Sequence, residues 1–281
     1  MKERPKLGRG LQDVSSYFLS RAARTGQVEG QPLKMAENTR TVCVCCPGSS
    51  LTQSSIISNI ALELARNRYA VTIKDFSMDP ELSVSNLMSS ILSEDEAGQG
   101  VSRARLYGLP DILIQQRNKE DIPELSGLEP GLAADKDKPL PGVVLVNPLP
   151  GLDFHLEAEA AHEYVLVTKT DEHSLLGCYA YMRVIRSRSL MARVHVVFDN
   201  TDHAHGSDDV FGKLARFVQE NLGLAIDFLG SLLRDDQYDR SIADKKPLVL
   251  SSGKSEAKET LLRICSLLLE GLNDQRRSPE P

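Results

Sequence analysis

The chain has 281 residues, of which 41% are hydrophobic and 26% are charged, and its formal net charge at pH 7 is −6. This length allows one large α/β domain or two small ones, and the net negative charge argues against general nucleic-acid binding, which usually needs a basic surface. No segment approaches the roughly 18 apolar residues of a membrane span, and the N-terminal MKERPKLGRG lacks the apolar core of a signal peptide, so we expect a cytoplasmic protein.

Residues 1–40 are polar and basic, with one apolar cluster that recurs at helical spacing. We expect a flexible N-terminal arm that contains a short amphipathic helix. Its apolar face would consist of Leu7, Leu11, Val14 and Phe18. The globular body is predicted to cover residues 41–272, and residues 273–281 form a polar tail.

Strand-like and helix-like segments alternate along the body. The expected strands are Val42–Cys46, Ala70–Lys74, Val143–Val146, Tyr164–Thr168, Val194–Phe198 and Ala225–Leu229. The expected helices are Ser54–Arg66, a stretch around Leu82–Leu92, Ser174–Arg188, Val210–Leu222 and Ser255–Leu272. Continuous apolar strands separated by amphipathic helices predict an α/β fold with a doubly wound, mainly parallel sheet. Ligands of such sheets bind beyond the carboxyl ends of the strands.

Residues 94–142 interrupt this alternation. They are rich in Gly, Pro and charge, and only Leu109–Ile114 is clearly apolar. We predict a short helix there, within a long surface excursion.

The cysteines fit a reducing compartment. Cys43, Cys45 and Cys46 lie in one apolar run, and Cys178 and Cys265 are isolated. Because alternate residues of a strand point to opposite faces, the first three are not expected to surround one metal ion. We expect buried free thiols.

The first strand leads into the stretch VCVCCPGSSLTQSS. Small residues before a helix let backbone N–H groups approach a phosphate, which makes this loop a candidate nucleotide site. The candidate residues are Gly48, Ser49, Ser50, Leu51, Thr52, Gln53, Ser54 and Ser55. A working loop, GxxxxGK[ST], needs a lysine where this chain has Gln53. By this motif alone, a polar turn with a serine helix cap is the better interpretation.

The surrounding segments resemble the MinD/ParA family of deviant P-loop ATPases. Ser58-Asn59-Ile60-Ala61-Leu62-Glu63-Leu64-Ala65 is similar to the family's "N-x-A-x-x-L-A" helix, and Ala70–Asp75 to the strand that ends in "D-x-D". Val143–Gly151 looks like the strand that ends in "D-x-P-A-G". Leu222–Gly230, followed by Lys246-Pro247-Leu248, is most similar to the FlhG (YlxH) branch, which regulates flagellar number and placement. The resemblance implies a P-loop NTPase fold of the SIMIBI/MinD-like type.

The residues that carry charge in the family are replaced here. The signature lysine falls on Gly48, the phosphate-loop lysine on Gln53, and the aspartate of "D-x-P-A-G" on Asn147. Asp75 keeps the first aspartate of "D-x-D", while the second falls on Ser77. The magnesium hydroxyl is kept as Ser54, which would hold Mg only if a nucleotide binds.

Two further segments have expected roles, one as an adenine contact and one as a helix cap. The family's adenine-contacting asparagine falls on Asp199, or on Asn200 with a shift of one residue. The stretch Ser251–Ser255 ends in GKS but is predicted to cap the last helix.

These replacements predict a degenerate nucleotide pocket and no ATPase activity. Each hydrogen bond between a charged group and phosphate is worth about 1.5–3 kcal/mol, so the loss of two lysines removes several kcal/mol of ATP affinity. Weak binding of ATP or ADP with Mg through backbone amides stays open. Three functions are weighed: a pseudo-ATPase regulator or scaffold for flagellar, polar or partitioning machinery, a divergent active ATPase, and an interaction module whose pocket is filled by side chains.

The arm suggests a protein partner. Lys6-Leu7-Gly8-Arg9-Gly10-Leu11 is similar to the "LGRGL" tail with which ParB-type adaptors engage a ParA ATPase. We expect Leu7, Arg9, Leu11, Val14 and Phe18 to bind another NTPase or a polar or flagellar component; the alternative is that the apolar residues pack on the body. A homodimer also stays open. The tail after Leu272 is too short for a membrane-targeting helix.

Overall fold

The computed structural model describes residues 39–93, 101–116, 141–149, 151, 161–188, 192–200 and 206–277. These residues all belong to one compact unit, Ala36–Pro281. Residues 1–38 of the predicted arm and residues 278–281 of the predicted tail lie outside them, while Thr39 and Arg40 belong to the first strand. Within the described part of the chain, no helix is long and apolar enough to span a membrane.

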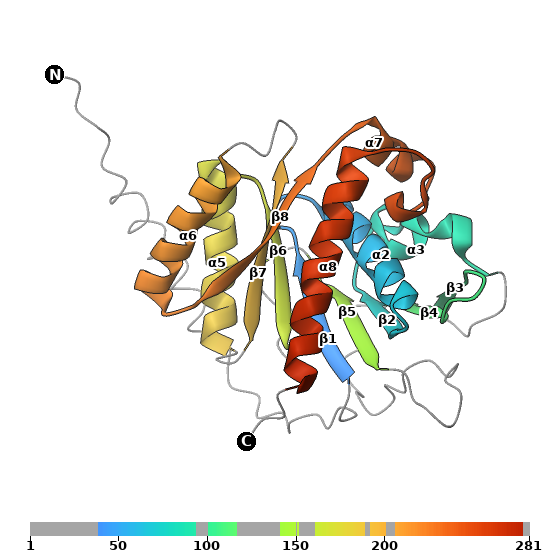
Figure 1. Ribbon diagram of the computed structural model, residues 1–281, viewed down its shortest axis with the longest axis horizontal. Coiled ribbons are helices and arrows are strands. Elements are labelled where there is room, and N and C mark those ends of the chain that lie inside the picture. The colour runs from blue at the N-terminus through green and yellow to red at the C-terminus, as the bar shows by residue number, and fades with distance from the viewer. Residues whose placement is uncertain are drawn as a thin grey trace. The chain divides into compact units, whose positions relative to one another are not determined.

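The sheet has eight strands in the order β3-β4-β2-β5-β1-β6-β7-β8 (Figure 1). Their bounds are β1 Thr39–Cys45, β2 Ala70–Asp75, β3 Val101–Ala104, β4 Ile112–Gln116, β5 Gly142–Asn147, β6 Glu163–Thr168, β7 Arg193–Asn200 and β8 Ile226–Leu233. Every neighbouring pair is parallel except β3 and β4. The predicted α/β fold with a mainly parallel sheet is therefore confirmed.

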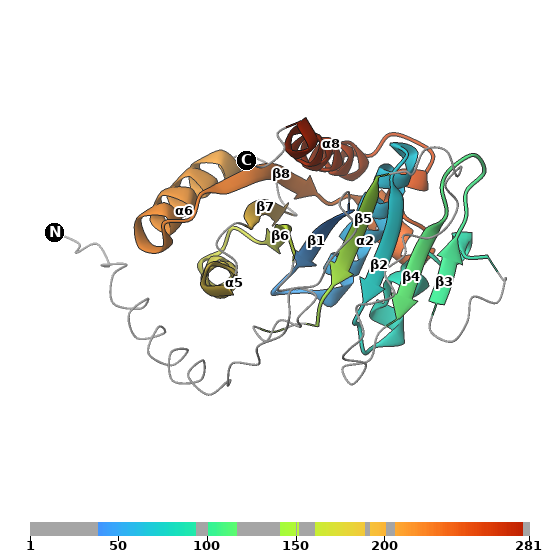
Figure 2. The same cartoon turned by 90° about the horizontal axis from the view of Figure 1, so that it is seen from below.

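The helices are α2 Ser50–Arg66, α3 Val84–Leu87, α5 Glu172–Arg188, α6 Ser207–Leu222, α7 Asp236–Ala243 and α8 Glu256–Arg277. Short 3-10 turns lie at η1 Pro80–Leu82, η2 Ser89–Ile91 and η4 Leu248–Leu250. Figure 2 shows α2 and α8 on one side of the sheet and α5 and α6 on the other. Helices thus lie on both faces of the sheet, which is consistent with the burial of the central strands β5 and β6 along their whole length.

The largest core lies between the sheet and the face formed by α2 and α8. Ile57 and Leu64 of α2 and Leu261 and Leu268 of α8 pack there, each with at most 1% of its surface exposed. The opposite face packs aromatic rings, and Phe211 of α6 stacks on Phe228 of β8 with 4.8 Å between the ring centroids. The sheet is therefore packed against helices on both faces, and this packing holds its strands in place.

Two segments have a different secondary structure from the one expected from the sequence. The helix expected within Leu109–Ile114 is instead the strand β4, which pairs with β2 on one side and β3 on the other. Long-range pairing decides the conformation here, because Ile112 and Ile114 face the core on alternate positions of a strand. The single helical stretch expected around Leu82–Leu92 is broken into η1, α3 and η2.

Candidate functional site

The candidate site lies where β1, β2 and β5 end. The loop after β1 contains only residues 46–49, because α2 begins at Ser50 rather than at the predicted Ser54. Ser49 caps the helix: its hydroxyl accepts a hydrogen bond from the backbone N–H of Thr52 at 3.2 Å. Gly48 is exposed, while Ser50 and Leu51 are partly buried in the first helical turn. The segment therefore combines the two interpretations of the sequence, a serine-capped turn placed where a phosphate loop would be.

Gln53 points inward and closes this loop from below. Its Oε1 accepts from the backbone N–H of Cys46 at 2.8 Å. Its Nε2 donates to Asn147 Oδ1 at 2.6 Å and to the backbone carbonyl of Pro148 at 2.8 Å. Gln53 is only 4% exposed. A neutral amide thus joins the ends of β1 and β5 at the position that the family resemblance gives to a lysine.

Asn147 continues the network towards β2. The parallel register places it beside Asp75, and its Nδ2 donates to Asp75 Oδ1 at 2.7 Å and to Ser54 Oγ at 3.0 Å. Ser54 Oγ in turn donates to the backbone carbonyl of Leu82 at 2.6 Å. All three side chains are buried. The structure therefore brings together Gln53, Ser54, Asp75 and Asn147, which the sequence places in separate segments.

Asp75 is the one carboxylate of this network, and backbone amides surround it. Its Oδ1 also accepts from the N–H of Ser77 at 3.0 Å, and its Oδ2 accepts from the N–H of Val84 at 2.7 Å. These bonds fasten the segment after β2 to the end of the strand. Ser55 lies one position further along α2, is buried, and its carbonyl accepts from Ser58 and Asn59.

This arrangement does not fit a magnesium–nucleotide complex. A functional site needs a lysine for the phosphates and free oxygen ligands for the metal. Gln53 and Asn147 use their amide groups on each other and on backbone, and the Ser54 hydroxyl both donates and accepts within the protein. Both oxygens of Asp75 accept protein N–H groups. Binding a nucleotide here would require several buried hydrogen bonds to break.

A second polar cluster lies beside the first turn of α2. Arg234, the residue after β8, donates through Nε to Asp199 Oδ1 at 2.8 Å and through Nη2 to Asp199 Oδ2 at 2.6 Å. The same Nη2 donates to Thr52 Oγ1 at 2.6 Å. The guanidinium also lies over the ring of Tyr238, 4.9 Å from its centroid. Asp199 thus holds an arginine at the position that the resemblance assigns to an adenine contact.

Sequence reasoning named Thr52 and Asp199 but missed Arg234. The available signal was its position directly after a strand that ends at this edge of the sheet.

The five cysteines are all free and buried, as predicted. Cys46 is the first residue of the loop, and burial raises the pKa of its thiol to about 11. Cys43 and Cys45 share one face of β1 with their sulfur atoms 3.6 Å apart. Among the described residues, no group of three or more His, Cys, Asp and Glu side chains is placed to hold a metal ion.

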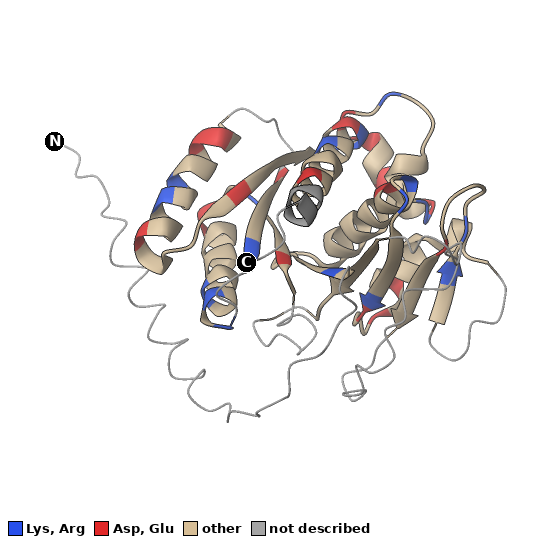
Figure 3. Cartoon of the chain, turned by 60° about the horizontal axis from the view of Figure 1, so that its bottom comes forward, with Lys and Arg blue, Asp and Glu red and all other residues tan. Residues whose placement is uncertain are grey.

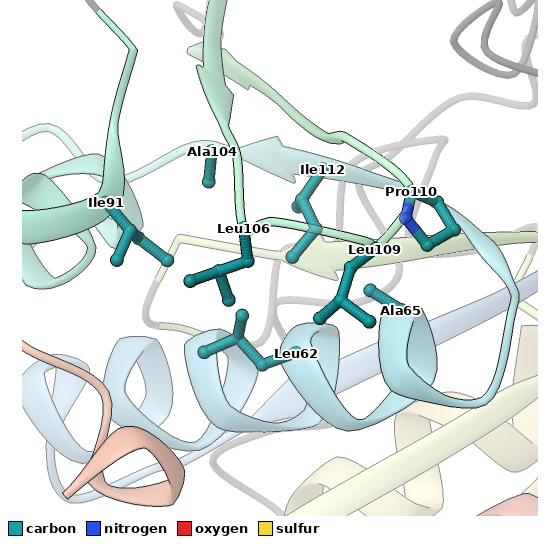
Figure 4. Close-up of a pocket in the computed structure, with 8 residues that line it drawn as sticks. All are labelled: Leu62, Ala65, Ile91, Ala104, Leu106, Leu109, Pro110 and Ile112. Carbon is teal, nitrogen blue, oxygen red and sulfur yellow. The ribbon is translucent and has the colours of Figure 1, made fainter.

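A hollow between α2, β3 and β4 lies away from this network (Figure 4). Its walls are entirely apolar, and it has no room for a water molecule. The lining residues are Leu62, Ala65, Ile91, Ala104, Leu106, Leu109, Pro110 and Ile112. We interpret it as a packing seam between α2 and the outer strands.

Charges of both signs are interspersed on the helices of the body. Figure 3 shows acidic and basic residues following one another along α6 and α8. On α6, Asp208 and Asp209 precede Lys213 and Arg216. The expected partner-binding residues Leu7, Arg9, Leu11, Val14 and Phe18 lie outside the described residues.

No protein-family model matches the sequence, and no curated protein matches it either. Solved structures match its fold. The MinD cell division protein of Aquifex aeolicus superposes with a TM-score of 0.57 at 11% identity, covering 86% of this chain and 98% of that one. A plasmid partition protein of Borrelia burgdorferi bound to AMPPNP gives 0.58 at 11% identity, over 83% and 99% of the two chains. A ParA family ATPase of Chlorobium tepidum gives 0.55 at 13% identity, over 83% and 100%.

A further match, at 11% identity and a TM-score of 0.57, is MinD of Aquifex aeolicus in a complex with MinC. At such low identities the likeness concerns the fold. The described body of this chain has the P-loop NTPase fold of the MinD and ParA ATPases.

Proposed function

We propose that this protein is a pseudo-ATPase: a MinD/ParA-like body that has given up ATP turnover and acts as a cytoplasmic regulator or scaffold. The observation that carries this proposal is the closed network of Gln53, Ser54, Asp75 and Asn147. Its side chains occupy the pocket with their own hydrogen bonds, where an ATPase would keep cationic and metal-binding groups free.

The missing charges strengthen the proposal. Phosphoryl transfer depends almost entirely on positioning and on stabilisation of developing negative charge. Gly48 and Gln53 supply no positive charge, and the guanidinium of Arg234 is already paired with both oxygens of Asp199. The hydroxyl and carboxylate that survive, Ser54 and Asp75, bond to the protein itself. Weak nucleotide binding would have to use backbone amides alone.

A protein of this kind acts through its partners. One MinD of the same fold is found in a complex with another protein. We propose that the arm, through Arg9 and the apolar residues Leu7, Leu11, Val14 and Phe18, engages another NTPase or a component of the flagellar, polar or partitioning machinery. The FlhG-like sequence features favour the flagellar setting.

The alternative function is a divergent ATPase that still cycles. It would use Ser54 and Asp75 for magnesium and a basic residue outside the loop for phosphate. Arg234 is a basic side chain that contacts the first turn of α2, but it would first have to leave Asp199. The two functions therefore differ in whether this network opens for ATP.

Calorimetric titration of the full chain with Mg-ATP and Mg-ADP, combined with a phosphate-release assay, separates the two functions. We expect no saturable binding up to about 1 mM nucleotide, because binding would break buried hydrogen bonds without gaining a lysine contact. A ParA-type ATPase measured in parallel serves as the positive control.

Micromolar affinity with turnover would overturn the pseudo-ATPase proposal. The variant Ser54→Ala then gives the specificity control: activity that disappears in this variant would establish the divergent ATPase, since Ser54 supplies its metal-binding hydroxyl.

A further inference from the structure

The first turn of α2 is wound tightly and held from two sides. Its N–H groups from Gln53 onward bond to carbonyls four residues earlier, as Gln53 N does to Ser49 O at 3.1 Å. On the inner side, the Gln53 side chain bonds to the end of β1. On the other side, the turn is held by Thr52, which accepts a hydrogen bond from the charged side chain of Arg234. In this state the N–H groups from Gln53 onward serve the helix and cannot face an anion.

The outer contact links three segments that are distant in sequence. Thr52 Oγ1 accepts from Arg234 Nη2 at 2.6 Å and donates to Ser49 Oγ at 3.0 Å. Ser49 Oγ is also the helix cap, since it accepts from Thr52 N. The arginine therefore supports the capping hydroxyl through a single intermediate side chain. Loss of Thr52 Oγ1 would remove both bonds at once.

Arg234 is itself fixed in place. Asp199 holds two of its nitrogens and is 5% exposed, and the Tyr238 ring lies beneath the guanidinium and is fully buried. Two hydrogen bonds between a guanidinium and a carboxylate orient the guanidinium as well as neutralising its charge. The guanidinium thus presents Nη2 to Thr52 from a rigid base at the ends of β7 and β8.

We propose that the Arg234–Thr52 contact is a latch that keeps the first turn of α2 wound and the loop closed. The latch rests on the proposed function, because a closed loop is what prevents the nucleotide pocket from forming. When Thr52 leaves Arg234, the Ser49 cap loses its support, and the turn of residues 50–53 opens towards the extended loop that a phosphate site requires. The latch acts on the loop and does not itself contact a ligand.

The decisive variant is Thr52→Val, which has nearly the same shape but lacks the hydroxyl and leaves the Arg234–Asp199 pair intact. Native-state hydrogen exchange of the amides of Gln53, Ser54 and Ser55 reports opening of this turn. We expect exchange to accelerate about tenfold or more in Thr52→Val, because a hydrogen bond to a charged group is lost together with cap support. Thr52→Ser keeps the hydroxyl and is expected to retain wild-type exchange.

Val165 and Val167 in the centre of β6 provide the internal control. Their amides are expected to exchange at the same rate in the wild type and in Thr52→Val. Unchanged exchange at Gln53–Ser55 would overturn the latch, and so would an equal acceleration at β6, because that result shows global destabilisation. Since exchange is measured without nucleotide, the latch can fail while the pseudo-ATPase proposal stands, and the reverse also holds.

Discussion

Glu163 and His195 form a buried polar pair between β6 and β7. Glu163 Oε2 lies 3.0 Å from His195 Nε2, and both residues are at most 3% exposed. Within the described part of the chain, Glu163 Oε1 and His195 Nδ1 find no hydrogen-bond partner. Asp227 Oδ2 lies 3.7 Å from Nδ1, on a side chain that is 66% exposed. One short contact therefore offsets the desolvation of two groups, which makes each dependent on the other.

Removing the side chain of Glu163 should therefore destabilise the fold. We expect Glu163→Ala to lower the free energy of unfolding by about 3–5 kcal/mol, because it leaves a buried imidazole without its partner. Asp227→Ala is the matched control and should cost less than about 1 kcal/mol, since its carboxylate is solvated. Chemical denaturation measures both. The double variant Glu163→Leu/His195→Phe should recover most of the loss, and a failure to recover would contradict this account.

At the scale of elements, Asp235 joins the starts of two helices. Its Oδ1 accepts from the N–H groups of Gln237 and Tyr238 and so caps α7. Its Oδ2 accepts from Ser255 Oγ at 2.7 Å and from Ala257 N at 3.3 Å at the start of α8. Ser255 itself caps α8, as predicted, by accepting from Lys258 N at 3.0 Å. One carboxylate thus joins the N-termini of α7 and α8.

We expect Asp235→Ala to cost about 2 kcal/mol of unfolding free energy, about 1 kcal/mol for each cap. Burial acts to raise the pKa of Asp235, but the hydrogen bonds from Ser255, Tyr238, Ala257 and Gln237 outweigh it and lower the pKa below its usual range. Because the folded-state pKa is depressed, the carboxylate stabilises the fold fully above the unfolded-state pKa of about 4. This contribution is lost as the pH falls further through the folded-state pKa.

Thermal unfolding from pH 7 to pH 2 measures this contribution. The difference between the wild type and Asp235→Ala should be constant near neutrality and should shrink at acidic pH. Asp244 is an exposed residue at the end of α7 and serves as the control. The unfolding free energy of Asp244→Ala should stay within about 0.5 kcal/mol of the wild-type value. A difference between wild type and Asp235→Ala that persists at pH 2 would show that the cap does not depend on ionisation.

The elements that sequence predicted well are those whose pattern is local. Apolar runs located β1, β2, β5, β6 and β7 to within a few residues. The start of α2 was predicted at Ser54 instead of Ser50, because a local pattern shows neither the Ser49 cap nor the hydrogen bond between Thr52 and Arg234, which is 182 residues away in sequence. The strand β4 was missed for the same reason: Leu109–Ile114 has no decisive local period, and pairing with β2 decides its conformation.

The location of the candidate site could be predicted from the arrangement of the whole sheet. Parallel strands bring their carboxyl ends to one edge, so the sequence predicted that the ends of β1, β2 and β5 would share a site. The register that places Asp75 beside Asn147 follows from that arrangement. The sequence could not predict that the amide of Gln53 would turn inward and close the pocket, because this conformation depends on its distances to Cys46 after β1 and to Asn147 at the end of β5.

At the scale of the whole molecule, the described core consists of residues from Val42 to Leu272, and residues 1–38 of the predicted arm lie outside the described residues. If the arm serves a partner, the body should not depend on it. We expect deletion of residues 1–35 to change the unfolding free energy by less than about 1 kcal/mol, with the denaturant dependence unchanged. In the full chain, Leu11→Asp and Phe18→Asp should each change the unfolding free energy by no more than the deletion does. A loss of several kcal/mol in these variants would instead show that Leu7, Leu11, Val14 and Phe18 pack on the body, since burial of such side chains is worth about 1.5–3 kcal/mol each.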